Sequence, residues 1–469
     1  MAGAVGRDHR YLMREREGAR LGVPGGVSWP GCRNRHSLGL LLLLATGWRP
    51  LPVWADTDAR EERSEDMPIT VTRDCPELAP FDEEMVAFMQ ARDVPGGALA
   101  VSRGGKLVLA RGYGWADRDT RQPVAPTSLF RIASVSKPIT AVAVLGLIER
   151  SEGNVSLDTP ALPLLGLEGA LRPPALPDPR LETVTLRQVL RHTAGWDRKA
   201  SFDPMFRPLR IAQDLGTTPP AGPDDVVRYM LTRFLDHDPG AQYAYSNFGY
   251  CLLGRIIEGL SGQTYEEHVA EHLLAPLGIT DMRIGHSLAE GRAPLEVRYH
   301  DPGVGRNVMT PQEDDTAPAP YGTFHLEAMD AHGGWIASAP DLVRFACALD
   351  DPQHCPILGP GAIADMFARP EGSAGFGDDG KPKAAYYGCG WLVRPKGGSK
   401  ANHWHNGSLP GTSSLLVRRH DGLNWAVLFN QRKDPSGLSY GDIDPALHRA
   451  ANRVQGWPED DLFPTLFGP

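Results

Sequence analysis

Ser134 and Lys137 stand three residues apart, and a hydroxyl with an amine at this spacing can form an activated nucleophile. If the apolar run that follows, Ala141–Ile148, is helical, both side chains lie on one face of its first turn. A serine hydroxyl attacks poorly until a base takes its proton, and a partly desolvated lysine can be that base or assist one. The positive helix N-terminus would favour the alkoxide and the oxyanion. Because S-x-x-K alone also occurs by chance, the interpretation needs partner motifs.

Tyr245-Ser246-Asn247 is the first partner motif. Ser246 or Asn247 can cap the helix predicted to follow, so Tyr245 is expected just before that helix. A phenol beside a lysine ammonium has a lowered pKa and can serve as general base toward Ser134. The Asn247 amide can hold a substrate carbonyl or orient Lys137. The alternative interpretation is a buried aromatic residue followed by a helix cap.

The second partner motif is His405-Asn406-Gly407, followed by Ser408, on a predicted strand. Gly407 would let a ligand approach the backbone closely. The backbone N–H of Ser408, with that of Ser134, is the candidate oxyanion hole. His405 can hydrogen-bond the phenol of Tyr245 or the substrate.

Together the three motifs resemble the serine β-lactamase and penicillin-binding-protein superfamily, in its class C-like branch, where S-x-x-K, Y-x-N and K-T-G or H-x-G follow in this order. Three further segments are similar to that family, and the resemblance extends from about Phe81 to Gln431. They are the hairpin of residues 96–114, the V-T-L-R-Q-V-L-R-H-T-A-G run of residues 184–195, and the G-G-W segment of residues 333–345. The resemblance implies a β-lactamase/transpeptidase-like fold.

The resemblance also implies roles for these residues. Ser134 would be the acylated nucleophile, Lys137 and Tyr245 the acid–base pair, and Asn247 a substrate contact. Lactam-processing members usually carry lysine at the position of His405. A histidine there is similar to the esterase (family VIII) and D-amino-acid peptidase relatives. This departure favours esters or D-peptides over β-lactams.

The leading hypothesis is therefore a secreted serine hydrolase that forms an acyl-enzyme with a small ester, amide or peptide substrate and needs no cofactor. A β-lactamase and a non-catalytic receptor acylated by cell-wall peptides are the alternatives. Metal-dependent hydrolysis has weaker support, because His403 and His405 share a strand face without a third ligand at close spacing. Three tryptophans are expected either to line an acyl pocket or to belong to the core: Trp196, Trp335 and Trp391.

The composition indicates an ordinary globular protein, with 41% hydrophobic and 22% charged residues in a chain of 469. The net charge of −9 argues against a nucleic-acid partner. The sequence leaves the oligomeric state open. Cys347 and Cys355 flank a short loop and could form a disulfide in an oxidising compartment. No two cysteines have C-x-x-C spacing, so the sequence does not indicate zinc binding or thiol redox chemistry.

Residues 1–55 are expected to form a leader with a cleavable signal peptide. The apolar run Leu38–Ala45 is too short to span a bilayer, and Val53-Trp54-Ala55 resembles a cleavage site, so the mature chain would begin near Asp56. A periplasmic or secreted location follows, without an integral membrane span in the mature protein. An uncleaved anchor is the alternative, and the polar start suggests an initiation codon later than Met1.

Residues 56–469 are predicted to form a single catalytic unit with a mixed α/β (α+β) fold. Strands toward both ends of the chain and helices between them favour an antiparallel sheet flanked by helices. The sheet part is expected at about residues 75–130 and 330–455, the mainly helical part at about 131–329, and the site at their junction.

Individual elements are predicted from caps and turns. Gly104-Gly105 and Asp421-Gly422 mark hairpins. Thr185 and Thr264 each open a helix through a capping box. The remaining predictions are helices over Asp224–Leu235 and Pro340–Leu349, strands over Tyr386–Val393, Asn402–His405, Ser413–Arg419 and Trp425–Asn430, and a loop over Arg298–Thr323 that either covers the site or is a plain insertion.

Overall fold

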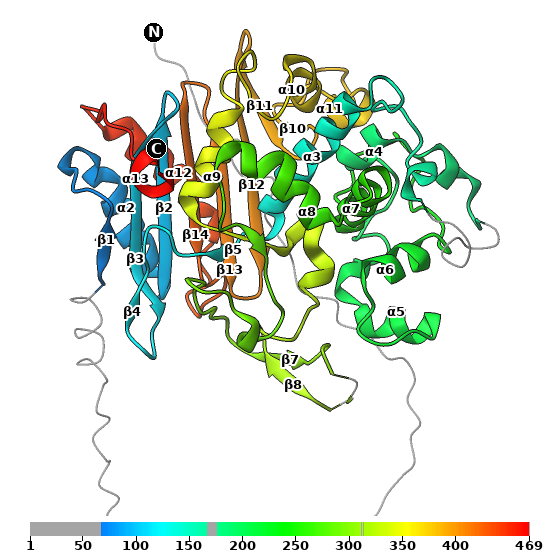
Figure 1. Cartoon of the computed structure of the whole chain (residues 1–469), viewed down its shortest axis with the longest axis horizontal. Coiled ribbons are helices and arrows are strands. Elements are labelled where there is room, and N and C mark those ends of the chain that lie inside the picture. The colour runs from blue at the N-terminus through cyan, green and yellow to red at the C-terminus, as the bar shows by residue number, and fades with distance from the viewer. Residues whose placement is uncertain (1–66, 167–175, 311, 313, 469) are drawn as a thin grey trace, which may run out of the picture. The chain divides into compact units, whose positions relative to one another are not determined.

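The first and last parts of the described chain combine in one antiparallel sheet (Figure 1). The computed structural model describes residues 67–166, 176–310, 312 and 314–468. The strand order is β1-β3-β2-β14-β13-β12-β11-β10, and β4 pairs with β3. The strands are β1 (Ile69–Val71), β2 (Gly96–Arg103), β3 (Lys106–Asp117), β4 (Gln122–Pro123), β10 (Tyr386–Tyr387), β11 (Leu392–Gly397), β12 (Lys400–Leu409), β13 (Thr412–Arg418) and β14 (Leu423–Phe429). Because β2 pairs with β14, the two ends of the chain close the sheet, which confirms the predicted fold class.

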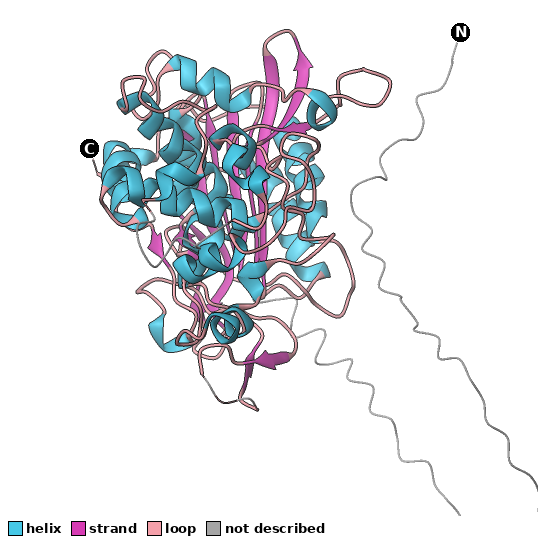
Figure 2. Cartoon of the chain, turned by 90° about the vertical axis from the view of Figure 1, so that its right-hand side faces the viewer, coloured by secondary structure: helices cyan, strands magenta, loops and turns pink. Residues whose placement is uncertain are grey.

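Helices cover both faces of this sheet (Figure 2). Along β2, Leu99 and Val101 belong to a core shared with α2 (Ala79–Ala91) and α12 (Ile443–Arg453). The alternate residues Ala98 and Ala100 belong to the core on the opposite face, which also includes side chains of α9 (Ala339–Ala348). Successive strand side chains point to opposite faces, so one strand serves two cores.

The chain between the two sets of strands supplies most helices near the site. They are α3 (Ser136–Arg150), α4 (Leu186–Leu190), α5 (Pro208–Leu215), α6 (Pro223–Met230), α7 (Asn247–Ser261) and α8 (Tyr265–Val269), and α10 (Pro360–Phe367), α11 (Gly372–Gly375) and α13 (Phe463–Phe467) follow later in the chain. The capping boxes predicted at Thr185 and Thr264 are both present. Ser246 caps α7, because its side chain accepts a hydrogen bond from the Gly249 N–H at 3.2 Å.

Two small sheets lie outside the large one. Strand β9 (Trp335–Ala337) pairs with β5 (Phe130–Arg131) and β6 (Arg283–Ile284), and β7 (Val304–Arg306) pairs with β8 (Thr316–Pro318). The loop predicted over Arg298–Thr323 thus contains a short hairpin.

This loop is tied to the chain just before Ser134 and to the turn after β12. The Tyr299 hydroxyl accepts a hydrogen bond from the Arg131 N–H at 2.7 Å. The Asp301 carboxylate accepts one from the Gly411 N–H at 3.0 Å. The loop therefore braces two elements that border the catalytic residues.

Three predicted elements are wrong in extent. The strand over Asn402–His405 is longer and runs from Lys400 to Leu409. The strand over Tyr386–Val393 is in fact two antiparallel strands, β10 and β11, joined by a turn through Gly390. Gly390 has φ +81°, and a Cβ there would lie 2.6 Å from the Cβ of Ala141, so the chain turns where only glycine fits. The helix over Asp224–Leu235 is shorter and ends at Met230.

The other predictions concern a disulfide, a membrane span, the leader and the division of the chain. Cys347 and Cys355 are both free, and the Cys347 thiol lies 3.0 Å from the Ser102 hydroxyl, so they form no disulfide in the structure. Across the described segments, no helix has the length and apolar character needed to cross a bilayer. The predicted leader lies outside the described residues. The division into a sheet part and a helical part stays a prediction.

Candidate active site

Ser134 lies in a single helical turn, Ala133–Val135, that leads into α3. Its neighbour Ala133 has φ +47°, a left-handed conformation that costs an alanine roughly 1–2 kcal/mol. The Ser136 hydroxyl holds this turn by donating a 2.7 Å hydrogen bond to the Ala133 carbonyl. From β13, the Ser414 hydroxyl donates another at 2.7 Å to the Ile132 carbonyl. The strained turn leaves Ser134 partly exposed, as a nucleophile must be.

The Lys137 amine contacts three oxygens beneath Ser134. Its Nζ lies 3.1 Å from the Ser134 hydroxyl, 2.8 Å from Oδ1 of Asn247 and 2.9 Å from the His332 carbonyl. Lys137 is fully buried, and none of these three contacts is a carboxylate. Burial, and secondarily the charge of Arg198, hold the pKa of Lys137 well below its usual value.

A neutral amine can also make these contacts. Its two N–H groups can donate to the Asn247 amide and the His332 carbonyl, which leaves the lone pair for the Ser134 hydroxyl proton. Lys137 in this form can take the proton of Ser134 directly.

Tyr245 reaches Ser134 from the other side, where its hydroxyl donates a 3.0 Å hydrogen bond to the serine oxygen. The prediction that its pKa is lowered is wrong. Burial raises the pKa of the Tyr245 phenol, and this effect exceeds the opposing effects of Ser134 and Arg198. The sequence correctly places a lysine nearby, but burial holds the pKa of that amine well below its usual value, which weakens its support for a phenolate. Tyr245 therefore holds its proton at neutral pH and can give it away.

His192 fixes the position of Tyr245. The two ring centroids lie 4.4 Å apart. His192 Nδ1 accepts a hydrogen bond from the Ser246 N–H at 3.2 Å, and its carbonyl accepts one from the Ala244 N–H at 2.8 Å. His192 thus forms hydrogen bonds with the residues on both sides of Tyr245. No role was predicted for His192, although it belongs to the H-T-A-G run that resembles the family.

Asn247 links Lys137 to a residue that the sequence analysis missed. Its Oδ1 accepts from Lys137, and its Nδ2 donates a 2.7 Å hydrogen bond to the carboxylate of Asp203. Because a carboxylate only accepts, Asp203 orients the amide so that oxygen faces the lysine. No local sequence signal identifies Asp203, which lies 44 positions before Asn247.

Strand β12 carries the third motif beside Ser134. Gly407 lies against the Ile132 carbonyl, where a Cβ would clash, and a Cβ there would also lie 3.1 Å from that of Ala133. Ser408 pairs with Ser413 of β13, and its side chain is exposed. The oxyanion-hole role of the Ser408 N–H stays a prediction.

His405 does not bond to Tyr245, so the first of its two expected partners is wrong, and the contact with substrate stays a prediction. Its Nε2 lies 2.9 Å from the Tyr387 hydroxyl, and its Nδ1 lies 2.8 Å from the Asn406 carbonyl. Strand β10 places the Tyr387 ring beside both the Tyr245 and the His405 rings, with centroids 6.4 and 5.8 Å away. Burial lowers the pKa of His405 to about 3, so this position is neutral.

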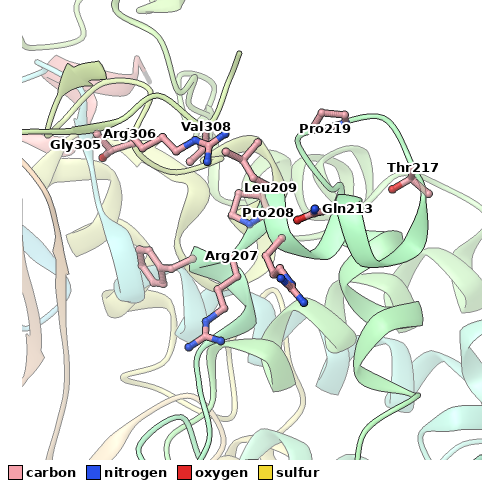
Figure 3. Close-up of a pocket in the computed structure, with 12 residues that line it drawn as sticks. Arg207, Pro208, Leu209, Gln213, Thr217, Pro219, Gly305, Arg306 and Val308 are labelled. Atoms are coloured by element: carbon pink, nitrogen blue, oxygen red, sulfur yellow. The ribbon is translucent and has the colours of Figure 1, made fainter. Parts of the chain in front are cut away.

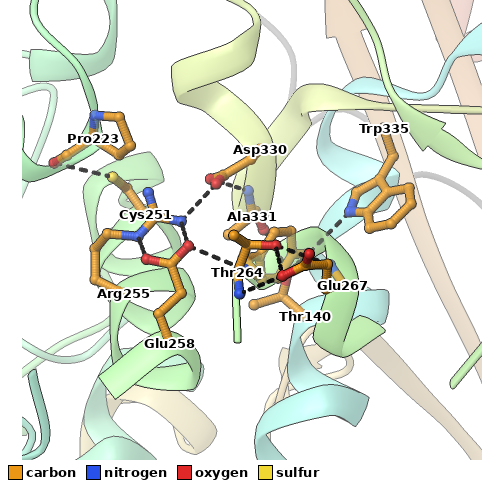
Figure 4. Close-up of polar contacts among 11 residues, drawn as sticks. Thr140, Pro223, Cys251, Arg255, Glu258, Thr264, Glu267, Asp330, Ala331 and Trp335 are labelled. Carbon is orange, nitrogen blue, oxygen red and sulfur yellow. Dashed lines mark hydrogen bonds and ion pairs between the residues drawn. The ribbon is translucent and has the colours of Figure 1, made fainter. Parts of the chain in front are cut away.

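The segment Asp330–Gly334, which supplies the His332 carbonyl, is a π-helical turn. Such turns are rare and frequent at functional sites. Two buried contacts hold this one (Figure 4): Arg255 pairs with Asp330 at 2.6 Å, and the Thr140 hydroxyl donates to the Ala331 carbonyl at 2.6 Å. Helices α3 and α7 thus fix the carbonyl that orients Lys137.

Arg255→Met is expected to lower the free energy of unfolding by about 3–5 kcal/mol, because it leaves the buried Asp330 carboxylate without its partner. Burial already raises the pKa of Asp330 despite that partner. Urea unfolding of the wild type and the variant measures the loss. The double variant Arg255→Met/Asp330→Leu, which removes both charges, should recover most of it. A loss below about 1 kcal/mol in the single variant would contradict this role of the pair.

A groove of about 640 Å³ lies between α5 and the β7–β8 region (Figure 3). Its lining includes Arg207, Leu209, Gln213 and Arg306 but none of the catalytic candidates. The three tryptophans considered for an acyl pocket are buried in the core instead.

The two histidines considered for a metal site have other contacts. The His403 ring packs on Phe367 at 3.9 Å, and His405 bonds to Tyr387. Within the described ranges, no three His, Cys, Asp or Glu side chains gather where they could hold a metal ion.

Known proteins resemble this chain along most of its length. Penicillin-binding protein 4* of Bacillus subtilis is 24% identical over 379 residues, which cover 78% of this chain and 73% of that protein. The crystal structure of the D-amino acid amidase of Ochrobactrum anthropi SV3 covers 81% of this chain and 99% of that one, with 22% identity and a TM-score of 0.60.

FimD of Dichelobacter nodosus (serogroup D), named for fimbrial assembly, is 32% identical over 252 residues, or 52% of this chain. The match spans only about half of that relative, 54% of its length. The sequence profile of the Beta-lactamase family matches residues 81–446, which include all three motifs. The chain belongs to the β-lactamase family.

Proposed function

We propose that this protein is a serine hydrolase that cleaves ester or amide bonds through an acyl-enzyme on Ser134. The observation that carries the proposal is the convergence of two groups on one oxygen: the Lys137 amine at 3.1 Å and the Tyr245 hydroxyl at 3.0 Å from Ser134 Oγ. One can take a proton from Ser134 while the other can give one to a leaving group.

Acylation begins when Ser134 Oγ attacks the substrate carbonyl and Lys137 takes its proton. The backbone N–H groups of Ser134 and Ser408 stabilise the oxyanion. As the bond to the leaving group breaks, Tyr245 gives that group its proton and becomes a phenolate. The Lys137 ammonium, 4.9 Å from the centre of the phenol ring, stabilises the phenolate.

Deacylation reverses the proton transfers. A water molecule attacks the acyl carbon, and the Tyr245 phenolate takes the water proton. When the tetrahedral intermediate collapses, Ser134 leaves as its alkoxide and takes the proton from the Lys137 ammonium. The cycle ends with a carboxylic acid and with all three side chains in their starting states.

The proposed substrates are D-configured amides and peptides and simple carboxylic esters. The O. anthropi amidase has the same fold, and its name states that it acts on D-amino acid amides. The neutral His405 also favours these substrates over β-lactams, because the lactam-processing members that this sequence resembles usually carry lysine there. We further propose that residues 1–55 direct secretion, although they lie outside the described residues.

A receptor that is acylated without turnover is the second candidate, favoured by the likeness to penicillin-binding protein 4* along most of both chains. Slow deacylation would distinguish it from a hydrolase.

The test is turnover of a p-nitrophenyl ester, a D-amino acid amide and a chromogenic cephalosporin by the purified protein, with Ser134→Ala as control. Turnover of the ester and the amide above that of the cephalosporin supports the proposal, and cephalosporin turnover equal to the ester's would make the protein a β-lactamase.

The pH dependence of kcat/KM follows from the two shifted pKa values. Activity requires a neutral Lys137 and a protonated Tyr245. The lysine pKa is lowered, so activity should rise with pH through a value well below 10.5 and be fully present at higher pH. The tyrosine pKa is raised, so activity should fall only above pH 10. A pH profile with a D-amino acid amide measures both limbs, and a rising limb near pH 10.5 would contradict the neutral amine.

A further inference from the structure

The two ring nitrogens of His405 both have hydrogen-bond partners, and these partners define its protonation. Nδ1 lies 2.8 Å from the Asn406 carbonyl oxygen. Because a carbonyl only accepts, Nδ1 must carry a proton. Burial keeps His405 neutral at neutral pH, with its pKa lowered to about 3, so the ring has one proton in all. Nε2 is therefore an acceptor, and the Tyr387 hydroxyl donates to it at 2.9 Å.

Tyr387 holds this donor in a fixed position. Its side chain is 3% exposed, and burial raises the pKa of its phenol well above the usual value, so the hydroxyl keeps its proton. Its ring packs on that of His192, with centroids 4.5 Å apart. The turn that follows Tyr387 packs on α3, because a Cβ at Gly390 would lie 3.0 Å from the Lys137 carbonyl oxygen. The hydroxyl is thus placed relative to the helix that carries the catalytic lysine.

Strand β12 loses its pairing on one edge just before the third motif. Strand β11 pairs with β12 only as far as Trp404, which lies opposite Leu392. Strand β13 continues along the other edge as far as Leu409. In the stretch beyond Trp404, the hydrogen bond between Tyr387 and His405 connects β12 directly to β10. This side-chain contact supports the strand where the ladder with β11 has ended.

We propose that Tyr387 is a positioning residue for the oxyanion hole. Its hydroxyl fixes the His405 ring, and that ring fixes the Asn406 carbonyl. The carbonyl lies two residues before Ser408, whose N–H is the proposed oxyanion donor. An oxyanion hole stabilises the transition state most when its donors are already oriented before the reaction begins. This inference rests on the proposed function and adds a residue outside the three motifs.

Tyr387→Phe tests the inference, because it keeps the ring that packs on His192 and removes only the hydroxyl. We expect kcat/KM to fall roughly 10-fold, the scale of one hydrogen bond. The factor should be the same for a p-nitrophenyl ester and a D-amino acid amide, because both reactions pass through an oxyanion. Phenylboronic acid forms a tetrahedral adduct with a serine hydroxyl, so its Ki should rise by a similar factor. A merely structural role would lower the active fraction and leave this Ki unchanged.

Tyr386→Phe is the matched control on the same strand. The Tyr386 hydroxyl donates a 2.9 Å hydrogen bond to the Phe367 carbonyl, so this variant also loses one hydrogen bond. Among the described residues, that hydroxyl makes no hydrogen bond to the third motif. Its kcat/KM and its Ki for phenylboronic acid should stay within about twofold of the wild type.

The variant His405→Leu shows whether Tyr387 acts through His405. In this background the ring nitrogens are absent, so adding Tyr387→Phe should cost less than about twofold in kcat/KM. A roughly 10-fold cost in both backgrounds would overturn the proposed connection, because it would show that the hydroxyl acts independently of the histidine.

Nitrogen-15 NMR of the wild-type protein with labelled histidine supplies a test that needs no folded Tyr387 variant. The His405 resonances are identified by their absence from the spectrum of His405→Leu. We expect the Nδ1–H form at neutral pH. The Nε2–H form would overturn the proposal, because Nδ1 would then have no proton to donate to the Asn406 carbonyl.

The outcomes separate this inference from the proposed function. If the wild type turns over the ester and Tyr387→Phe leaves both kcat/KM and Ki unchanged, the positioning role is wrong and the hydrolase stands. If the wild type forms no acyl-enzyme and does not bind phenylboronic acid, both proposals fail.

Discussion

Ser134→Ala is expected to lower kcat by roughly 10⁴-fold or more for every substrate that the wild type turns over. The substitution removes the oxygen on which Lys137 and Tyr245 converge, and no acyl-enzyme can form without it. It keeps the Ser134 N–H and removes only one oxygen atom from a partly exposed side chain, so the fold should be retained. The measurement is steady-state turnover of a p-nitrophenyl ester by the purified variant, with its unfolding midpoint as the test of folding.

Ser399→Ala is the matched control, because Ser399 is exposed in the turn between β11 and β12. It should retain wild-type turnover. Retained activity in a folded, pure Ser134→Ala protein would contradict the assignment of the nucleophile.

Tyr245→Phe is expected to lower kcat by roughly 10²–10⁴-fold, the usual scale for loss of a general acid–base group. The variant keeps the ring that packs on His192 and loses only the hydroxyl that bonds to Ser134. The effect should therefore fall mainly on kcat and little on KM. It should also be larger for an amide than for a p-nitrophenyl ester, because an amine needs protonation to leave and p-nitrophenolate does not.

Tyr243→Phe provides the comparison for this variant. Tyr243 lies two residues away, is 40% exposed and also packs near His192, but its hydroxyl makes no contact with Ser134. Its kcat should stay close to that of the wild type. A Tyr245→Phe variant that also stays within about threefold of the wild type would exclude the phenol as the acid–base group.

The predictable part of the site is the part encoded by short spacings. The pair Ser134 and Lys137 meets because three residues make about one helical turn. The cap at Ser246 places Tyr245 before α7, and residues on a strand alternate, which puts His405 and Gly407 on one face.

What the sequence does not give is burial and long-range partners. The resemblance to the family places Lys137 near Tyr245 but does not show that both side chains are buried. The predicted pKa shift of the phenol therefore had the wrong sign. The His332 carbonyl, 195 positions after Lys137, and the Asp203 carboxylate reach the site only through the tertiary fold. No local pattern identifies such contacts.

In the fold, too, local features could be predicted from the sequence, and features set by distant contacts could not. Gly104-Gly105 and Asp421-Gly422 mark hairpins that the structure contains, because turn chemistry is local. The strand predicted over Tyr386–Val393 instead turns back at Gly390, where the chain packs against Ala141 of α3. The sequence alone does not distinguish a glycine that is required by packing against a distant residue from a glycine that is tolerated inside a strand.

The most direct test of the central claim is to find the acyl group on Ser134. The wild-type protein is mixed with excess p-nitrophenyl ester, quenched in acid within the first turnovers, digested and analysed by mass spectrometry. We expect one acyl group per chain, located by fragmentation at Ser134, and none on the Ser134→Ala protein. An acyl group on another residue, or ester turnover with no acylated peptide, would contradict the proposed mechanism.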